Sequence, residues 1–388
     1  MCSKFNGERL RTARIYRGMT LAELGELIDL SKQTLSLYEN NRGVPDFSTV
    51  IKLTNALHFP ANYFFQKDRI YITSGTTYFR SLISTTKKSR DAEITKVEYI
   101  AALYEVLCQY INFPRLNLPR VNIETKYIDD SMIEEIAYKV RESWGLGNDP
   151  IEDLQYILEE NGLIVVGSNV SDTKIDAYSQ ILNIDNSETY IIVLSVGQKT
   201  KARINFDLAH ELGHIMLHPW TEDVETLSNE EFKERERQAN KFASCFLLPQ
   251  ETFLVDYRKY PTDLEYYRTM KSKWNCSIQA MLYRANDLKI ISNNQFQYLM
   301  RQVSKRGWRK KEPGDYPHTL NENIFKMSID LLVENGYSKK DIMEIFDGGL
   351  VSLFSDEIES LLNLPKDYFK INEVEENKII ELKINKKK

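Results

Sequence analysis

The hydrophobic and polar positions of the chain change their period several times, and each change predicts a different kind of element. Over residues 5–66 the apolar residues recur at helical spacing, and breaks around Gly18, Asp29 and Gly43 divide the segment into short helices. Residues 67–128 predict a helical connector, which ends in the loop FPRLNLPRV because prolines cannot continue a helix. The N-terminal third is therefore expected to be helical.

The middle of the chain switches from helical to strand-like patterning and back. Helical spacing in SMIEEIAYKVRESWGLG and IEDLQYILEENG predicts two helices. The runs LIVVGSNV, DAYSQILNI and TYIIVLSV are β-rich and bounded by polar turns, so they predict one small sheet. Two long helices are expected at about 199–218 and 229–248, and the chain is helical again after Pro249. This pattern predicts an α+β fold that is mostly α.

Composition places the chain among ordinary globular proteins. Its 388 residues are 42% hydrophobic and 28% charged with a formal net charge of −5, which excludes a disordered or globally basic chain. Cys2, Cys108, Cys245 and Cys276 are far apart and form no CxxC pair, so we expect reduced thiols. The start of the chain lacks an apolar signal core, and the longest apolar run, YIIVLSV, is too short to span a bilayer. A cytoplasmic protein without membrane contact is expected.

Two helices joined by a tight turn are predicted near the N-terminus, in TLAELGELIDLSKQTLSLYENNRG. Thr20 and Ser31 occupy N-cap positions, and the turn around Asp29 has the length found in helix-turn-helix units. The helices share an apolar side formed by Leu24, Leu27, Ile28, Leu35 and Tyr38. The outward side of the second helix carries polar groups suited to phosphates and base edges, namely Lys32, Gln33 and Ser36.

This segment resembles the lambda-repressor-like (XRE) helix-turn-helix family. The matching points are LAELGELIDLSKQTLSLYEN, including Glu39, and Pro45 followed by DFSTVIKLTNALHF. Asp29 replaces the usual turn glycine, which is tolerable because Asp visits left-handed conformations. Leu21 and Leu37 replace frequently polar positions, and Leu37 suits apolar contact with a thymine methyl.

The resemblance implies binding to double-stranded operator DNA through Ser31, Lys32, Gln33, Ser36 and Leu37. Such operators are usually palindromic and bound by dimers, so a homodimer is expected. The alternative is a helix-turn-helix that serves only dimerisation or partner docking. Residues 1–66 carry eight Lys/Arg against six Asp/Glu, and this balance of +2 gives only modest attraction to phosphates.

The stretch FDLAHELGHIMLHPW, residues 206–220, holds three of the five histidines. His210 and His214 are four residues apart, so both imidazoles lie on one helical face and can converge on one metal ion. Glu211 lies beside them, placed to take a proton from a water at that ion.

A catalytic zinc site needs a third protein ligand and an open position. His218 is not expected to be that ligand, because eight residues of helix rise about 12 Å, which is too far for three side chains to reach one ion. Its expected role is structural, or a hydrogen bond near the helix end.

The next predicted helix offers a better third ligand. Ser228 and Glu231 form a capping box, which starts a helix at Asn229. On a helical wheel Glu236 falls inside the apolar stripe, whereas Glu230 points to the opposite side. An ionised carboxylate on a buried face is costly unless it is paired or binds a metal. Glu236 is therefore the candidate ligand, with a buried salt bridge as the alternative.

RINFDLAHELGHIMLH followed by EFKERERQANKFASCFLLP resembles the ImmA/IrrE family of gluzincin-like metallopeptidases, and the resemblance extends over residues 130–312. It implies a Zn²⁺ site, with Mn²⁺ as the alternative ion, held by His210, His214 and Glu236. Glu211 would be the general base. Asn240, one turn beyond Glu236, is expected to orient that carboxylate.

The predicted organisation is a helix-turn-helix DNA-binding domain (1–70), a helical connector (71–128), a metallopeptidase domain with a small β-sheet (129–312), and a helical C-terminal region with a charged tail (313–388). Within the peptidase domain the zinc core covers about 160–250, and a basic helical subdomain covers 251–312. This subdomain has thirteen Lys/Arg and six Asp/Glu, and its helix, WNCS turn and helix look like a second helix-turn-helix. A solvated basic face is the favoured interpretation; a nucleic-acid or acidic-partner contact that gates the protease is the alternative.

The joined resemblances predict a DNA-binding regulator with zinc-dependent endopeptidase activity. The expected substrate is a lambda-repressor-like regulator or antitoxin in a stress, mobile-element or toxin–antitoxin circuit. The alternative is a non-catalytic transcriptional repressor that uses the zinc-peptidase fold as a sensor. Glu211 favours catalysis, because a structural zinc site needs no base beside its ligands.

Overall fold

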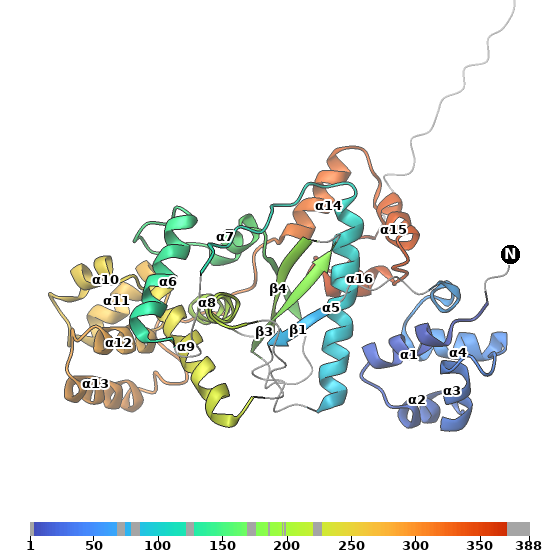
Figure 1. Ribbon diagram of the computed structural model, residues 1–388, viewed down its shortest axis with the longest axis horizontal. Helices are drawn as coiled ribbons and strands as arrows, with labels where there is room; N and C mark the ends of the chain where they lie inside the picture. The colour runs from blue at the N-terminus through green and yellow to red at the C-terminus, as the bar shows by residue number, and fades with distance from the viewer. Residues whose placement is uncertain are drawn as a thin grey trace, which may run out of the picture.

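The computed structural model describes residues 4–67, 74–78, 86–121, 128–168, 176–184, 187–195, 197, 199–219 and 227–370, with only the backbone of 74–78. Within these residues the protein is rich in helices and contains one small sheet, which confirms the predicted α+β, mostly α class (Figure 1). No helix in the described part of the chain is long and apolar enough to cross a membrane.

The N-terminal domain is helical, with α1 (Gly7–Tyr16), α2 (Leu21–Ile28), α3 (Lys32–Glu39), α4 (Phe47–Leu57) and the 3-10 helix η1 (Ala61–Phe65). Both predicted N-caps form: Thr20 accepts from the backbone of Glu23, and Ser31 accepts from the backbone of Thr34 at 3.0 Å. Asp29 ends α2 in the left-handed conformation with φ 58°, so it performs the role that a turn glycine usually has.

In the described residues the sheet has four strands in the order β1-β3-β4-β2, namely β1 (Ser74–Tyr78), β2 (Ile164–Ser168), β3 (Ala177–Ile184) and β4 (Ser187–Ser195). β2 runs parallel to β4, and the other neighbours are antiparallel. β2 to β4 coincide with the predicted β-rich runs. β1 corrects the prediction of a purely helical connector over 71–128. The sequence SGTTY lacks apolar alternation, and β1 pairs with a strand that is distant along the chain, so local patterning could not reveal it.

The two faces of the sheet contribute to different cores. On one face Val165, Ile192 and Leu194 pack with α6 (Asp130–Ser143), α7 (Leu154–Glu160), α8 (Lys201–Leu217) and α9 (Asn229–Leu247). On the other face Val166 and Tyr178 pack with α5 (Lys87–Cys108) and the C-terminal helices. Figure 1 shows the sheet between α8 on one side and α5 with α14 and α16 on the other.

The C-terminal region is more than an appended set of helices. α14 (Ile324–Glu334), α15 (Lys339–Gly348) and α16 (Ser355–Leu361) share one hydrophobic core with α5 and the N-terminal domain. Arg17 bonds to Glu357 at 2.6 Å and Arg9 donates to the carbonyl of Leu350, so polar contacts also tie the N-terminal domain to this region. The predicted charged tail, residues 371–388, lies outside the described residues.

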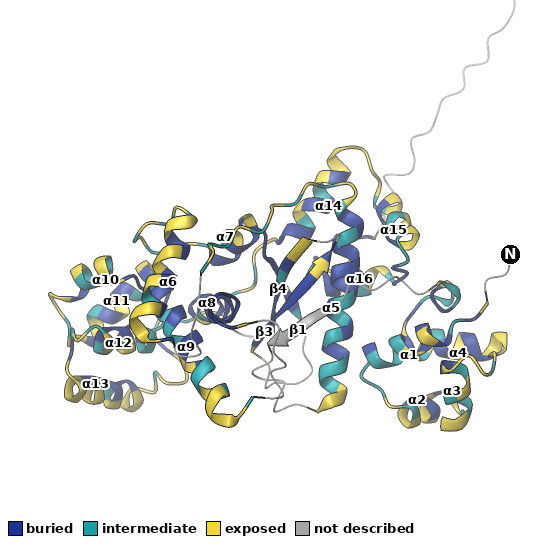
Figure 2. Ribbon diagram, viewed as in Figure 1, coloured by how far each residue is buried: buried dark blue, intermediate teal, exposed yellow. Residues whose placement is uncertain are grey.

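Four helices follow the histidine-bearing core: α10 (Gln250–Tyr257), α11 (Leu264–Trp274), α12 (Ile278–Asp287) and α13 (Asn293–Lys305). α11 and α12 are joined by a short turn with Asn275 in the left-handed conformation, as in a helix-turn-helix. Ile278, Met281 and Leu282 of α12 are buried, so one face of this helix packs into the subdomain. α13 is exposed along its outward face (Figure 2).

Candidate metal centre

α8 is buried along nearly all of its length, between the sheet and α9 (Figure 2). His210 and His214 lie one turn apart on the face of α8 that meets α9, and each is less than a tenth exposed. Glu236 comes from α9, which begins at the predicted capping box of Ser228 and Glu231. The two helices thus bring the three predicted side chains together.

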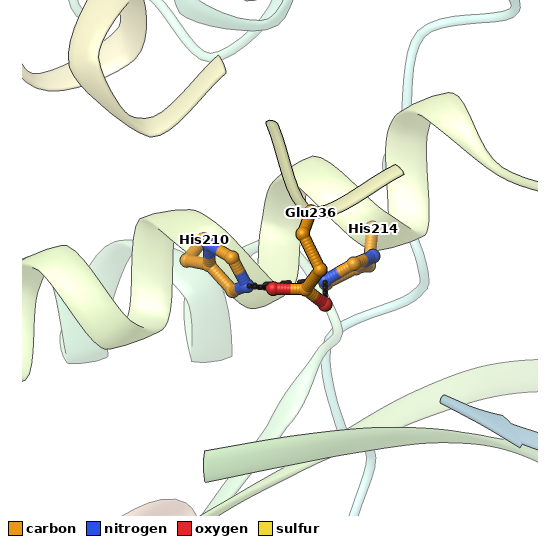
Figure 3. Close-up of side chains that lie close together, drawn as sticks. All are labelled: His210, His214 and Glu236. Carbon is orange, nitrogen blue, oxygen red and sulfur yellow. Dashed lines mark hydrogen bonds and ion pairs between the residues drawn. The ribbon is translucent and has the colours of Figure 1, made fainter. Parts of the chain in front are cut away.

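The ligand-type atoms of these residues converge on one point (Figure 3). The Nε2 atoms of His210 and His214 are 3.1 Å apart, and the Glu236 oxygens lie 3.5 and 3.3 Å from them. One nitrogen or oxygen from each residue lies within 4.8 Å of the other two. Burial alone would raise the pKa of Glu236, but the two imidazoles beside its carboxylate lower it below its usual range.

Gly213, inside the HELGH motif, permits the close approach of α9. A side chain there would place its Cβ 3.1 Å from the carbonyl oxygen of Ala239 and 3.1 Å from Cβ of Phe242. Both atoms belong to buried parts of α9 that have little room to move. The glycine therefore sets the helix spacing that lets Glu236 reach the imidazoles.

Each imidazole is oriented by its second nitrogen. His210 Nδ1 lies 3.1 Å from Oδ1 of Asn240, and because that oxygen only accepts, the nitrogen donates. The lone pair of neutral His210 is then on Nε2, which faces Glu236. Asn240 was expected to orient Glu236. Its side chain instead reaches from α9 to α8, where its hydrogen bond orients the ring of His210.

A chain of hydrogen bonds orients His214. Its Nδ1 lies 3.0 Å from Nδ1 of His218, whose Nε2 lies 3.0 Å from Oε1 of Gln238. The Gln238 amide nitrogen donates to Glu234 at 3.1 Å, so its oxygen accepts from His218. Burial, together with the nearby His214, lowers the pKa of His218 well below its usual value and keeps this ring neutral. His218 therefore accepts from His214, and His214 presents its lone pair at Nε2.

His218 is thus a hydrogen-bond partner of His214, which agrees with the role expected from its distance along the helix. We expect His218→Phe, which keeps a ring but removes the acceptor, to weaken Zn²⁺ binding about 10- to 100-fold. Competition titration with a zinc chelator measures this, with His58→Phe in the N-terminal domain as the matched control. Unchanged affinity would mean that the hydrogen bond does not orient a ligand.

Glu211 lies on the same turn as His210 and is also buried. The hydroxyl of Ser179 on β3 donates to its Oε2 at 2.7 Å. Burial raises the pKa of Glu211 to about 7, against the lowering effects of His210 and Ser179. Sequence reasoning missed Ser179, although a polar residue on the inward side of the apolar run DAYSQILNI was a signal. Tyr78 of β1 lies opposite Ser179 in the strand register.

The side chains fit a divalent cation. Asn240 and His218 accept hydrogen bonds from the Nδ1–H groups of His210 and His214, so two imidazole lone pairs and an anionic carboxylate face the same point. Three acceptors placed this close repel one another unless a proton or a metal ion lies between them. Two imidazoles and one carboxylate form a donor set that zinc accepts.

The predicted DNA-binding residues lie on or beside α3. Lys32, Gln33 and Leu37 are exposed, Ser36 is half-buried, and Ser31 is the exposed N-cap of the helix. Glu39 at the other end is buried and bonds to Arg14 at 2.6 Å, so its role is internal.

Comparison with known proteins agrees with both parts of the chain. A family model described as a helix-turn-helix domain matches residues 7–70, and one described as an IrrE N-terminal-like domain matches residues 162–286. The HTH-type transcriptional regulator ImmR of Bacillus subtilis (strain 168) is 34% identical over 64 residues, which is 16% of this chain and 50% of that protein. The chain therefore spans about half the length of the curated relative that it matches.

The protein thus combines an XRE-type helix-turn-helix domain with an IrrE/ImmA-like, metallopeptidase-like domain. Both family resemblances predicted from the sequence are confirmed. The second family implies a divalent metal, and the His210, His214 and Glu236 cluster is a candidate site for it.

Proposed function

We propose that this chain is a DNA-binding regulator with zinc-dependent endopeptidase activity. The observation that carries the proposal is the convergence of His210, His214 and Glu236 within 4.8 Å, with the buried carboxyl group of Glu211 on the same helix. His210, His214 and Glu236 would hold the ion. Zn²⁺ fits this donor set better than Mn²⁺, which prefers more oxygen ligands.

When bound, zinc polarises the scissile carbonyl and acidifies the attacking water. Glu211 then acts as general base: its carboxylate takes one proton from that water while the remaining hydroxide bonds to the carbonyl carbon. The C–N bond breaks as Glu211 passes the proton to the leaving amine. Ser179 fixes one oxygen of this carboxylate at 2.7 Å, so Glu211 is positioned before the substrate arrives.

The N-terminal domain would bind double-stranded operator DNA through Ser31, Lys32, Gln33, Ser36 and Leu37, as a homodimer on a palindromic site. The protein substrate would be a lambda-repressor-like regulator or an antitoxin. The name of the matched relative, a transcriptional regulator, supports the regulatory part. Binding at an operator would place the peptidase near the proteins that occupy such sites.

A cleavage assay tests the central proposal. The intact chain is incubated with purified lambda-repressor-like proteins, with Zn²⁺ or with a chelator, and products are identified by mass spectrometry. Defined fragments that form only with metal support the peptidase. The opposite result would be full metal occupancy, no fragments from any of the tested proteins, and normal repression of a reporter. That result would favour the non-catalytic sensor.

DNA recognition has its own expected outcome. Lys32→Ala combined with Gln33→Ala should weaken binding to the DNA upstream of the gene at least 10-fold, because a good base contact contributes about 1–3 kcal/mol. Fluorescence anisotropy with labelled duplex measures this. Arg11→Ala combined with Asn55→Ala removes the same group types from exposed positions on α1 and α4 and serves as the control. Equal losses in both variants would argue against α3 as the reading helix.

A further inference from the structure

α13 and the turn after it form an exposed surface that carries only one sign of charge. The segment NNQFQYLMRQVSKRGWRKK, residues 293–311, contains no Asp or Glu in a protein whose net charge is −5. Its six basic residues are all exposed: Arg301, Lys305, Arg306, Arg309, Lys310 and Lys311. We call this set, with the outward face of α13, the α13 surface.

Three other basic residues of the same subdomain are paired with acidic neighbours. Lys271 bonds to Glu312 at 2.9 Å, and Lys273 bonds to Asp256 at 2.8 Å. The fully buried Arg284 is paired with Glu134. On the α13 surface, Arg306 is the one basic residue that forms an ion pair with any described residue; its partner, Glu265, is about half exposed. The positive charge of the α13 surface is therefore largely uncompensated.

The helix separates an apolar face from a polar one. Phe296, Leu299, Met300 and Val303 are buried against the subdomain. At 100° per residue, Asn294, Tyr298, Arg301 and Lys305 fall within an arc of about 60° on the outward side. Tyr298 is 56% exposed. Cationic, amide and aromatic side chains on one exposed stripe are the groups that bind phosphates and bases.

The N-terminus of the neighbouring α12 is not available to an external anion. This helix end is already occupied, because Glu312 accepts from the backbone N–H groups of Ile278 and Gln279 at 2.8 and 3.2 Å. The anion-binding capacity of that helix end is thus used by the chain's own carboxylate.

We propose that the α13 surface is a second, sequence-independent binding site for duplex DNA, through contacts to its phosphate backbone. DNA is favoured over an acidic protein because the same chain carries a DNA-binding domain, which raises the local concentration of duplex around α13. α13 and α3 lie at opposite ends of the molecule, so the two sites would contact separate stretches of DNA (Figure 1).

The test measures how binding depends on salt. Anisotropy titrations with a labelled duplex that contains no operator are made at several salt concentrations, using the full chain in the Lys32→Ala, Gln33→Ala background to suppress the helix-turn-helix contribution. Arg301→Ala, Lys305→Ala and Arg309→Ala are then added together. Lys340→Ala, Lys366→Ala and Lys370→Ala remove equal charge from exposed positions in the C-terminal region and form the control.

The slope of log K against log salt should fall in magnitude by about 2 to 3 in the α13 variant, since each phosphate contact contributes about 0.9. Binding should weaken at least 10-fold near 0.1 M salt, while the control variant keeps the parent slope. Equal slopes in all three proteins would overturn the proposal. So would a variant that loses binding to polyglutamate but keeps its DNA affinity, because the surface would then serve an acidic protein. Circular dichroism and unchanged zinc occupancy establish that the variants are folded.

Discussion

Glu211→Gln is expected to reduce peptide-bond cleavage by about 10²- to 10⁴-fold, the usual contribution of a general base. Glutamine keeps the size of the side chain and can still accept from Ser179, so neither packing nor the hydrogen bond at 2.7 Å should be lost. It cannot accept a proton from the attacking water. The initial rate of fragment formation, quantified by mass spectrometry at saturating Zn²⁺, measures the effect.

The control is Glu230→Gln, which makes the same chemical change at an exposed position on α9. Zinc affinity is measured for both variants, because Glu211 is not expected to be a ligand and its replacement should leave occupancy unchanged. Cleavage by Glu211→Gln at the control rate would refute the general-base role. Unchanged repression of a reporter by Glu211→Gln would show that regulation does not depend on catalysis.

The parts of the site set by short-range rules were predictable from the sequence. Two histidines four residues apart must share a helix face, and the capping box at Ser228 fixes the start of the next helix. With that start known, the helical period places Glu236 on the buried face, where a carboxylate needs a cation. The turn at Asp29 followed similarly from local backbone preferences.

Other parts depend on contacts between segments that are distant in the sequence. Ser179 bonds to Glu211 only because β3 packs on α8. Gln238 bonds to His218 only because α9 packs beside α8. The hydrophobic periodicity of the sequence does not indicate which strand packs against which helix. The bond between Arg17 and Glu357 joins residues 340 positions apart, so the packing of the N-terminal domain on the C-terminal region was equally beyond local patterns.

Glu236→Gln is expected to remove most of the stabilisation that zinc gives the folded protein. A ligand at 100 times its Kd stabilises the native state by about 2.7 kcal/mol, and loss of the anionic donor should raise the Kd enough to abolish that gain. Glutamine preserves the volume at this buried position, so the metal-free protein should remain folded. Differential scanning calorimetry with and without Zn²⁺ measures the change in Tm for the wild type, for Glu236→Gln and for the exposed-site control Glu230→Gln.

The quantity to compare is the zinc-induced shift in Tm rather than Tm itself. Removing the carboxylate ends its repulsion with Glu211 and also its favourable interaction with the two imidazoles, so the Tm of metal-free Glu236→Gln can differ from that of the metal-free wild type in either direction. For the wild type and the control, about 2.7 kcal/mol corresponds to a shift of several degrees, since a domain of this size shifts about 2–4 °C per kcal/mol. If Glu236→Gln retained the full shift, zinc would be binding elsewhere. A zinc ion at His210 and His214 would then lack its third protein ligand, and the peptidase mechanism could not operate at this site.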